Sequence, residues 1–435
     1  MVFYIKRFIT QKSLKMSKTI LNKINQYCFP IFIFLVIITG DWDSIFRKII
    51  VFSFSFFIIV LTIPKLRIKN NVNIIALLIF IYLTICVTTS ITAYNSIISI
   101  YFFLRIFLFF LIIISLYYWL NTPHRLQMLC NSIVLSGLIL GLSILFSILS
   151  GSYVTELEGN IRVGGIFSNV NTAGYICYTS IVFAYFQYLK NRRKISFLLI
   201  FFLFVCLILT GSRASLLALG VTFVFYNIRF RLNKKIIIAT IVLLISSLVG
   251  GFLYKDTLSN ALRLNRGLSA RDVLYNTAIE IFKDHPNLGI GLGNLKVIGS
   301  EYINKVEVSN WRKEHLLEIG IQSSHNAFLE TAVEIGIYGS FVFILIILLI
   351  GRKYFLSIKV NKLNFKKNYC YLFWGFWAGI FIRSFFESNG IINRGWITVD
   401  IYFWVMFVLF LKFDQLVKFN KNLDEKNIYN SRERG

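Results

Sequence analysis

Three residues at the start of one long apolar run carry the side chains best suited to acid–base chemistry. His325 directly precedes the apolar run 326–350, and Glu330 and Glu334 follow it four residues apart. On a helix this spacing places both carboxylates on one face, just below the histidine. Carboxylates inside a membrane span are costly and mark functional sites by default. The group predicts a general base, His325, at the mouth of a helix bundle. The alternative is that both carboxylates pair with arginines for packing.

Arginines also stand beside apolar runs. Arg213 lies in the short turn 210–215 between two runs, and Arg271 lies in the longest polar segment, next to Asp272. A planar guanidinium donates paired hydrogen bonds that match a phosphate or a diphosphate. We therefore predict that Arg213 binds such a group, with snorkelling at the membrane boundary as the alternative. For Arg271, pairing with Asp272 or Glu280 is an equal alternative.

Two further polar turns, 162–171 and 383–394, complete the set. Asn169 and Asn171 are predicted to cap the helix that follows them, and hydrogen bonds to sugar hydroxyls are the alternative. The residues with a candidate supporting or sugar-binding role are, in chain order, Arg162, Asn169, Asn171, Asn326, Glu330, Glu334 and Glu387.

Two motifs that resemble known ligand sites are weaker. The glycine-rich run 289–293 looks like a phosphate cradle, but no strand precedes it, and turn formation is the better prediction. Asp41 and Asp43 match the D-x-D metal motif of nucleotide-sugar transferases, a match that chance readily produces, and solvation of a helix boundary is the better prediction. We predict neither a metal nor a cofactor. Arg105 and Asp400, both within apolar runs, are candidates for one buried network.

The elements that must position these residues are membrane helices. The 435 residues are 57% hydrophobic and 15% charged, which is more apolar surface than one soluble core can hide. Lipid admits only helices or closed barrels, and the apolar runs are too long and too continuous for barrel strands. The sequence therefore predicts an all-α, polytopic bundle of about twelve transmembrane helices. The runs are 28–46, 48–64, 74–92, 97–119, 129–149, 173–189, 195–210, 214–228, 236–253, 326–350, 369–386 and 396–412.

Lys and Arg concentrate in alternate gaps between these runs, so the positive-inside rule places both termini in the cytoplasm. The predicted organisation is a basic N-terminal segment (1–27), spans one to nine (28–253), a large external loop (254–324), spans ten to twelve (325–413) and a cytoplasmic tail (414–435). Within the loop, 270–283 has helical spacing and is predicted to lie against the bundle.

The net charge of +26 thus reflects membrane orientation, and a nucleic-acid partner is not expected. The six cysteines all fall in or beside apolar runs and are predicted to be core side chains.

Four motifs, taken in order, resemble the O-antigen ligase family, which also holds polymerases of capsule and O-antigen repeat units. They are Phe-Ser-Asn-x-Asn-Thr-Ala-Gly, Gly-Ser-Arg-Ala-Ser-Leu-Leu, Ala-Arg followed by His-Pro-Asn-Leu-Gly-Ile-Gly-Leu-Gly-Asn, and His-Asn-Ala-Phe-Leu-Glu followed by Glu-Ile-Gly-Ile-Tyr-Gly. The resemblance covers about 162–339. It implies inverting, metal-independent glycosyl transfer from an undecaprenyl-diphosphate-linked glycan. Arg213 and Arg271 match the family's diphosphate-binding arginines, and His325 matches its essential histidine. In many ligases another histidine stands where this chain has Ser323.

The resemblance implies a bacterial inner-membrane enzyme of surface polysaccharide biosynthesis with its site facing the periplasm. The acceptor is another glycan for a repeat-unit polymerase, or the lipid A core for a ligase. The nearly neutral external loop slightly favours the polymerase. Expected partners are the lipid-linked donor, this acceptor and membrane lipids, and a chain-length regulator stays open. A transporter or flippase of lipid-linked sugars is a remote alternative, because the polar residues crowd one face and no repeat is evident.

Overall fold

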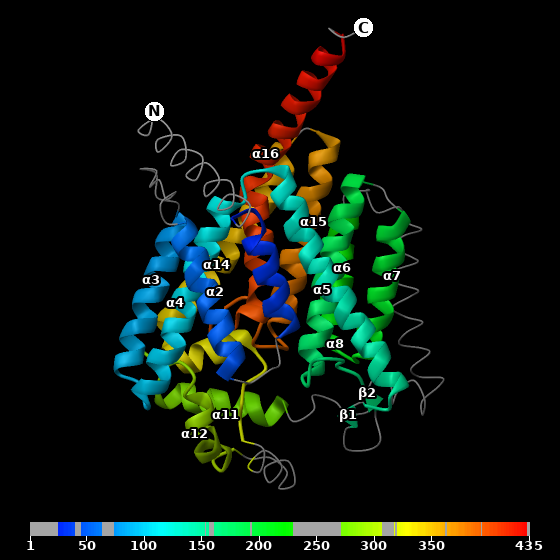
Figure 1. Ribbon diagram of the computed structural model, residues 1–435. Helices are drawn as coiled ribbons and strands as arrows, with labels where there is room; N and C mark the ends of the chain where they lie inside the picture. The colour runs from blue at the N-terminus through cyan, green and yellow to red at the C-terminus, as the bar shows by residue number, and fades with distance from the viewer. Residues whose placement is uncertain are drawn as a thin grey trace, which may run out of the picture.

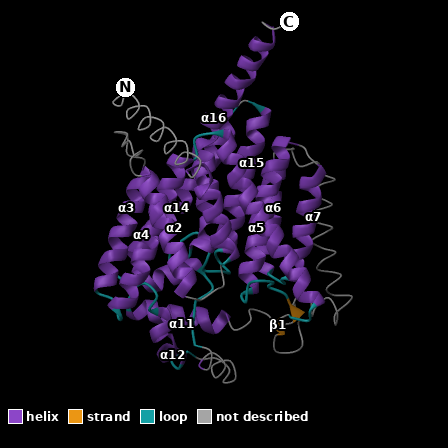
Figure 2. Cartoon of the chain, viewed as in Figure 1, coloured by secondary structure: helices purple, strands orange, loops and turns teal. Residues whose placement is uncertain are grey.

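The chain forms a bundle of helices (Figures 1 and 2). The computed structural model describes residues 25–39, 45–62, 74–152, 154–155, 161–191, 194–228, 271–306, 317, 320–361, 363–392 and 394–432. The long helices are Asn25–Ile38, α2 (Ile45–Thr62), α3 (Ile74–Ile91), α4 (Ser96–Trp119), α5 (Pro123–Leu149), α6 (Val170–Asn191), α7 (Lys194–Leu209), α8 (Arg213–Asn227), α14 (Ala327–Val360), α15 (Asn364–Arg383) and α16 (Ile397–Arg432). The shorter elements are α11 (Arg271–Asp284), α12 (Leu295–Ile303) and the antiparallel strands β1 (Val154–Thr155) and β2 (Ile161–Arg162).

The prediction of a helical membrane protein is confirmed for these residues, and the short β1–β2 hairpin is a small addition to the all-α fold. Helices α3, α4, α5 and α14 are each long and apolar enough to cross a membrane. Every predicted apolar run coincides with a helix except 236–253, which lies outside the described residues. The total of twelve spans and the placement of the large loop between spans nine and ten stay predictions. Helix α16 continues past the predicted tail boundary to Arg432.

The outer surface of the bundle is apolar. Phe52, Phe80, Phe201 and Phe341 are 62%, 67%, 62% and 66% exposed, and they lie on different helices. Soluble proteins rarely expose contiguous apolar surface on this scale. Hydrocarbon is the solvent that such a surface fits.

Helices α11 and α12 lie together at one end of the bundle, the end that also carries the β1–β2 hairpin (Figure 1). They share a small core with α14, in which Val273, Ile281, Ile298 and Val333 are buried. The prediction of a helix near 270–283 packed against the bundle is therefore confirmed.

Helix α14 is kinked near its start, at Gly336. The φ of 65° and ψ of −168° at this residue belong to a region that essentially only glycine adopts. The kink leaves two carbonyl groups without helical partners, those of Val333 and Glu334. They accept hydrogen bonds from the backbone N–H groups of Ile290 (2.9 Å) and Gly291 (2.9 Å). The glycine-rich run therefore supplies backbone donors to carbonyl groups at the kink of α14.

The same run also packs tightly against α4. A Cβ atom on Gly291 would lie 2.5 Å from Ser99 Oγ, and one on Gly293 would lie 2.3 Å from the ring of Phe102. Both glycines have positive φ, 92° and 75°. The run forms turns that allow close packing, as predicted, and its backbone donors at Ile290 and Gly291 are occupied by α14.

Small residues let α15 approach α8 closely. A Cβ on Gly375 would lie 2.4 Å from the carbonyl oxygen of Thr222, and one on Gly379 would lie 2.5 Å from that of Ala218. Thr222 Oγ1 also lies 2.9 Å from the hydroxyl of Tyr178 on α6, within hydrogen-bond distance. In lipid the hydrophobic effect does not drive helices together, and small residues allow the close van der Waals packing that does. The contact fixes the helices from which the polar end of the bundle is built.

Replacement of Gly379 by alanine is expected to destabilise the bundle by about 1–3 kcal/mol, the usual cost of overpacking a filled interface. The measurement is thermal unfolding of the purified protein in detergent. Gly220→Ala is the matched control, because no atom lies within 4 Å of a Cβ added to this helical glycine. Alanine also favours a helix over glycine. Equal melting temperatures for the two variants would contradict the packing described for α8 and α15.

Candidate active site

His325 lies at the polar end of the bundle, two residues before α14 begins. Its backbone adopts φ = 51°, a left-handed conformation that is uncommon outside glycine and that recurs at functional sites. The conformation is held because His325 N–H donates to Ser323 Oγ (3.0 Å) and the side chain of Asn326 caps α14. The imidazole remains 35% exposed. The turn therefore presents the ring to the outside of the bundle.

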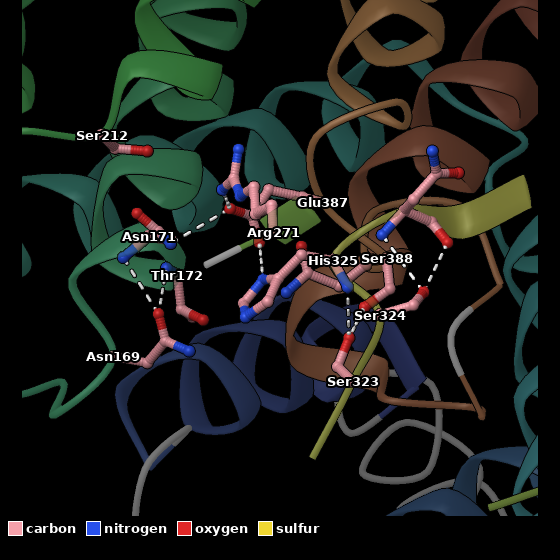
Figure 3. A network of polar contacts seen from close by, with 12 residues as sticks. Asn169, Asn171, Thr172, Ser212, Arg271, Ser323, Ser324, His325, Glu387 and Ser388 are labelled. Atoms are coloured by element: carbon pink, nitrogen blue, oxygen red, sulfur yellow. Dashed lines mark hydrogen bonds and ion pairs between the residues drawn. The ribbon is translucent and has the colours of Figure 1, made fainter. Parts of the chain in front are cut away.

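Glu387 joins the predicted site residues to one another (Figure 3). Its carboxylate is 3% exposed and comes from the loop between α15 and α16. His325 Nδ1 lies 3.3 Å from Oε2, and Arg271 Nη2 lies 2.8 Å from Oε1. Asn171 Nδ2 donates to the same Oε1 at 3.0 Å. The structure thus brings His325 and Arg271 to one carboxylate, and Arg271 pairs with neither Asp272 nor Glu280 among the ion pairs of the described residues.

Arg162 extends this network toward α8. It belongs to β2, and its Nη2 donates to Asn171 Oδ1 (2.8 Å) while its Nε donates to the carbonyl oxygen of Thr210 (3.0 Å). Its Nη2 also reaches the carbonyl oxygen of Gly211 (3.3 Å). The hairpin therefore ties the start of α6 to the turn that precedes α8.

Arg213 is the first residue of α8, directly after that turn. Its guanidinium lies within electrostatic range of those of Arg271 and Arg162. Arg162, Arg213 and Arg271, from three separate segments, thus lie near one another, and Arg271 is paired with the carboxylate of Glu387. Proximity of like charges is unfavourable unless an anion shares the space.

The two asparagines predicted as caps do different things. The side chain of Asn169 accepts hydrogen bonds from the N–H groups of Asn171 (3.0 Å) and Thr172 (3.2 Å), so it caps α6 as predicted. The prediction that Asn171 also caps is wrong, because its side chain bridges Arg162 and Glu387 instead.

Asn326, predicted as a sugar-binding candidate, uses its side-chain oxygen to cap α14 at Phe328 N (3.0 Å) and Leu329 N (3.1 Å). That oxygen supports the helix on which Glu330 and Glu334 stand.

Glu330 and Glu334 form a second cluster with Arg394. Arg394 Nη2 lies 3.0 Å from Glu330 Oε1, and Arg394 Nε donates to Glu334 Oε1 at 2.8 Å. The pairing with an arginine, given above as the alternative for these carboxylates, is therefore what the structure contains.

Glu330 has a second task. Its Oε2 accepts hydrogen bonds from Ser323 Oγ (2.7 Å) and from Ser324 N (2.9 Å). Ser323 Oγ in turn lies 2.6 Å from Ser388 Oγ. Glu330 thus holds the backbone segment that leads into His325, whereas Glu334 bonds to Arg394 deeper in the bundle.

The charges around His325 increase its affinity for a proton. Burial opposes protonation of His325, but the hydrogen bond to Glu387 and its negative charge outweigh it, so the pKa of His325 is raised. Burial alone would raise the pKa of Glu387, yet the hydrogen bond and charge of His325, with Arg383 and Arg271, hold it below its usual value. Burial lowers the pKa of Arg162 to about 10, against the charge of Glu387.

Two contacts escaped the sequence reasoning. Tyr275 Oη donates to the carbonyl oxygen of Phe385 (2.9 Å), which anchors the loop that carries Glu387, and Ser388 bonds to Ser323 as described. Tyr275 stands four residues after Arg271, so helical spacing was the available signal. Asp400 and Arg105 are within electrostatic range of each other, as the predicted buried network requires.

In the described part of the chain, the side chains that could hold a metal ion are those of His, Cys, Asp and Glu. Among those residues no three His, Cys, Asp or Glu side chains group as metal ligands. Asp41 and Asp43 lie outside the described residues. The six cysteines are buried and free, as predicted for core side chains.

The fold and site together define a helical membrane protein with an arginine-rich polar site at one end of its bundle. Residues 195–344 match the family model described as O-Antigen ligase, and this match confirms the resemblance found in the sequence. The matched segment contains Arg213, Arg271 and His325. No protein of curated function matches the chain.

Replacement of Glu387 by glutamine is expected to lower the pKa of His325. The substitution removes the charge that favours the imidazolium and leaves the burial that opposes it. The measurement is the pH titration of the ring by NMR on histidine-labelled protein in nanodiscs. Glu301→Gln, at an exposed position of α12, is the control and should leave the titration unchanged. An unchanged or raised pKa in Glu387→Gln would show that the contact does not govern the histidine.

Proposed function

We propose that this chain transfers a glycan from undecaprenyl diphosphate to an acceptor sugar hydroxyl during the biosynthesis of a surface polysaccharide. It acts from the bacterial inner membrane as a multi-pass protein with both termini in the cytoplasm and its site facing the periplasm. The observation that carries the proposal is the shared carboxylate of Glu387, which joins His325 to Arg271 beside Arg162 and Arg213. The family match over 195–344 supports a membrane glycosyltransferase of the O-antigen ligase family.

In the proposed reaction His325 acts as the general base. Its Nδ1 stays bonded to Glu387, so Nε2 is the atom that removes the proton from the acceptor hydroxyl. The resulting alkoxide-like oxygen attacks the anomeric carbon as the bond from that carbon to the diphosphate oxygen breaks. The electron pair leaves with the diphosphate, and the configuration at the anomeric carbon inverts. Glu387 stabilises the imidazolium that forms.

Arg213 and Arg271 stabilise the departing diphosphate. A guanidinium carries five N–H donors, and the bond between Arg271 and Glu387 occupies only some of them. Fixed positive groups aimed at the leaving group lower the transition-state energy more than that of the ground state, because charge grows there as the bond breaks. The energy of transfer resides in the bond between the glycan and the diphosphate, so the reaction needs no nucleotide.

The remaining candidates support this arrangement. Arg162, Asn169 and Asn171 organise the side of the site toward α8, and Asn326 and Glu330 hold the turn of His325. The clustering of polar residues at one end of the bundle, away from its midplane, speaks against a transporter of lipid-linked sugars.

Transfer is expected to fall by about 100-fold or more in His325→Ala, because general bases contribute about 10²–10⁴-fold. A similar loss is expected in Arg213→Ala, as for removal of one donor to a developing anion. The assay uses purified protein, lipid-linked glycan donor and acceptor. His285→Ala and Arg352→Ala, both at exposed positions, are the matched controls. Near-normal transfer by both His325→Ala and Arg213→Ala would refute the assignment.

A repeat-unit polymerase and a ligase that joins glycan to the lipid A core share this donor and this chemistry. The polymerase is slightly favoured, because lipid A core phosphates call for a strongly basic outer surface and the external loop is nearly neutral. Purified lipid-linked repeats alone should therefore give chain growth. Transfer that requires added lipid A core, with no growth in its absence, would identify the ligase instead.

A further inference from the structure

A second group of cations converges on one aromatic ring at the α4 side of the site. The centre of the Phe102 ring lies 5.2 Å from Arg105 Cζ, 5.5 Å from Lys296 Nζ and 5.7 Å from Arg394 Cζ. Cations within about 6 Å of a ring centre are attracted by its electrons. The three come from α4, from α12 and from the loop before α16. Nothing in the proposed transfer step uses Arg105 or Lys296.

Only one of these cations is neutralised by an ion pair. Arg394 is held by the two carboxylates of α14, whereas no ion pair joins Arg105 or Lys296 to a carboxylate among the described residues. Asp400 is within electrostatic range of Arg105, but it is fully buried and its Oδ1 accepts a hydrogen bond from Gly390 N (2.8 Å). Among the described residues, therefore, no ion pair neutralises the partly buried Arg105 or the exposed Lys296.

The position of these charges indicates where an anion would come from. Arg105 lies nine residues into α4 from Ser96, about 13 Å along the helix at 1.5 Å per residue. Its neighbours Tyr101 and Leu104 are 48% and 55% exposed on the surface that lipid covers. Lys296 is exposed on α12, just outside the bundle. A charge inside a membrane span is expensive and functional by default.

The start of α12 is locked over α4, so Lys296 does not reach Phe102 by chance. Asn294 Nδ2 donates to Ser99 Oγ (2.9 Å), and Asn294 Oδ1 accepts from Asn95 N (3.0 Å). Gly293 packs directly on the ring of Phe102. The pair of cations is thus built on rigid elements, as a binding site requires.

The two groups of cations flank the turn of His325. Arg394 touches the ring of Phe102 on one side and Glu330 on the other, and Glu330 holds the backbone at Ser324, next to His325. On the opposite side of the turn stand Glu387 and the diphosphate-binding arginines. Figure 1 shows α4 and α12 on one side of this end of the bundle and α6 and α8 on the other.

We propose that Arg105 and Lys296 bind the phosphate group of the acceptor lipid. The inference rests on the proposed function, in which two lipid-borne glycans must meet at His325 and the first group of arginines serves only the donor. An undecaprenyl-diphosphate-linked repeat and the lipid A core both carry phosphate close to their acyl or prenyl chains. A lipid phosphate that approaches along α4 would meet Arg105 from the lipid side and Lys296 from outside.

Native mass spectrometry of the full-length protein tests the proposal by counting bound lipids, independently of catalysis. The probes are undecaprenyl diphosphate, lipid A and phosphatidylglycerol, each titrated alone, and undecaprenyl diphosphate together with lipid A. Wild type is expected to bind two molecules of undecaprenyl diphosphate if the acceptor is a lipid-linked repeat. It binds one of these and one lipid A if the acceptor is the lipid A core. Arg105→Met and Lys296→Met should weaken the second binding event about tenfold, as loss of a charged hydrogen bond does, and leave the first intact.

Arg213→Ala should show the reverse pattern, and Lys283→Met, at an exposed position of α11, should bind like wild type. Arg105→Lys keeps the charge and should retain the second lipid, which separates a binding role from a packing role. Since Lys296 is exposed, Lys296→Met tests the site even if Arg105→Met fails to fold.

Unchanged lipid counts in Lys296→Met and Arg105→Met would overturn the acceptor site, and so would equal occupancy by phosphatidylglycerol. Neither result bears on the proposed roles of His325 and Arg213 in glycan transfer, which the transfer assay tests separately. Near-normal transfer in those two variants would refute the proposed function even if two lipids bind.

Discussion

The buried carboxylate of Glu387 is the interaction on which the rest of this site depends. A carboxylate removed from water is stable only with hydrogen-bond donors and positive charge around it. Here the donors come from three elements that are distant in sequence: Asn171 on α6, Arg271 on α11 and His325 before α14. Each partner is held in place because leaving the charge unpaired would cost more than any exposed ion pair is worth. One buried charge therefore sets the relative positions of the histidine and the arginine.

The kink of α14 is the second constraint, and it acts through the backbone. Because Gly336 breaks the helix, α14 offers two carbonyl groups to the glycine-rich run, and that run carries α12 with it against α4. Helices α11 and α12 are thereby attached to the bundle by hydrogen bonds between backbone groups of two separate segments. The three acids near His325 consequently differ in their tasks. Glu387 contacts the imidazole of His325, Glu330 holds the backbone turn that precedes this residue, and Glu334 binds Arg394.

Positive charge is distributed in one pattern along the whole chain and in another around the site. Over the whole chain, Lys and Arg account for the net charge of +26 and concentrate in alternate gaps between the apolar runs, the pattern from which the positive-inside rule predicts orientation. A few other arginines lie at the end of the bundle that carries His325, and the structure gathers them on both sides of that residue. A site that brings together two phosphate-bearing lipids needs cations in two separate places, since one cluster would draw both anions to the same point. The physical cost of these arginines is therefore a guide to function.

The sequence alone determined the membrane class and the positions of the helices that the structure describes, because apolar periodicity and the cost of charge in lipid are local properties. It also predicted a helix at 270–283 and the cap at Asn169. Partner choice was decided only by the tertiary structure. Arg271 could pair with nearby acids on its own helix, yet it pairs with Glu387, 116 residues away. Asn171 had the position of a cap and became a bridge. A hydrogen bond between residues distant in sequence depends on how whole helices pack. The spacing of residues along the chain does not specify this packing.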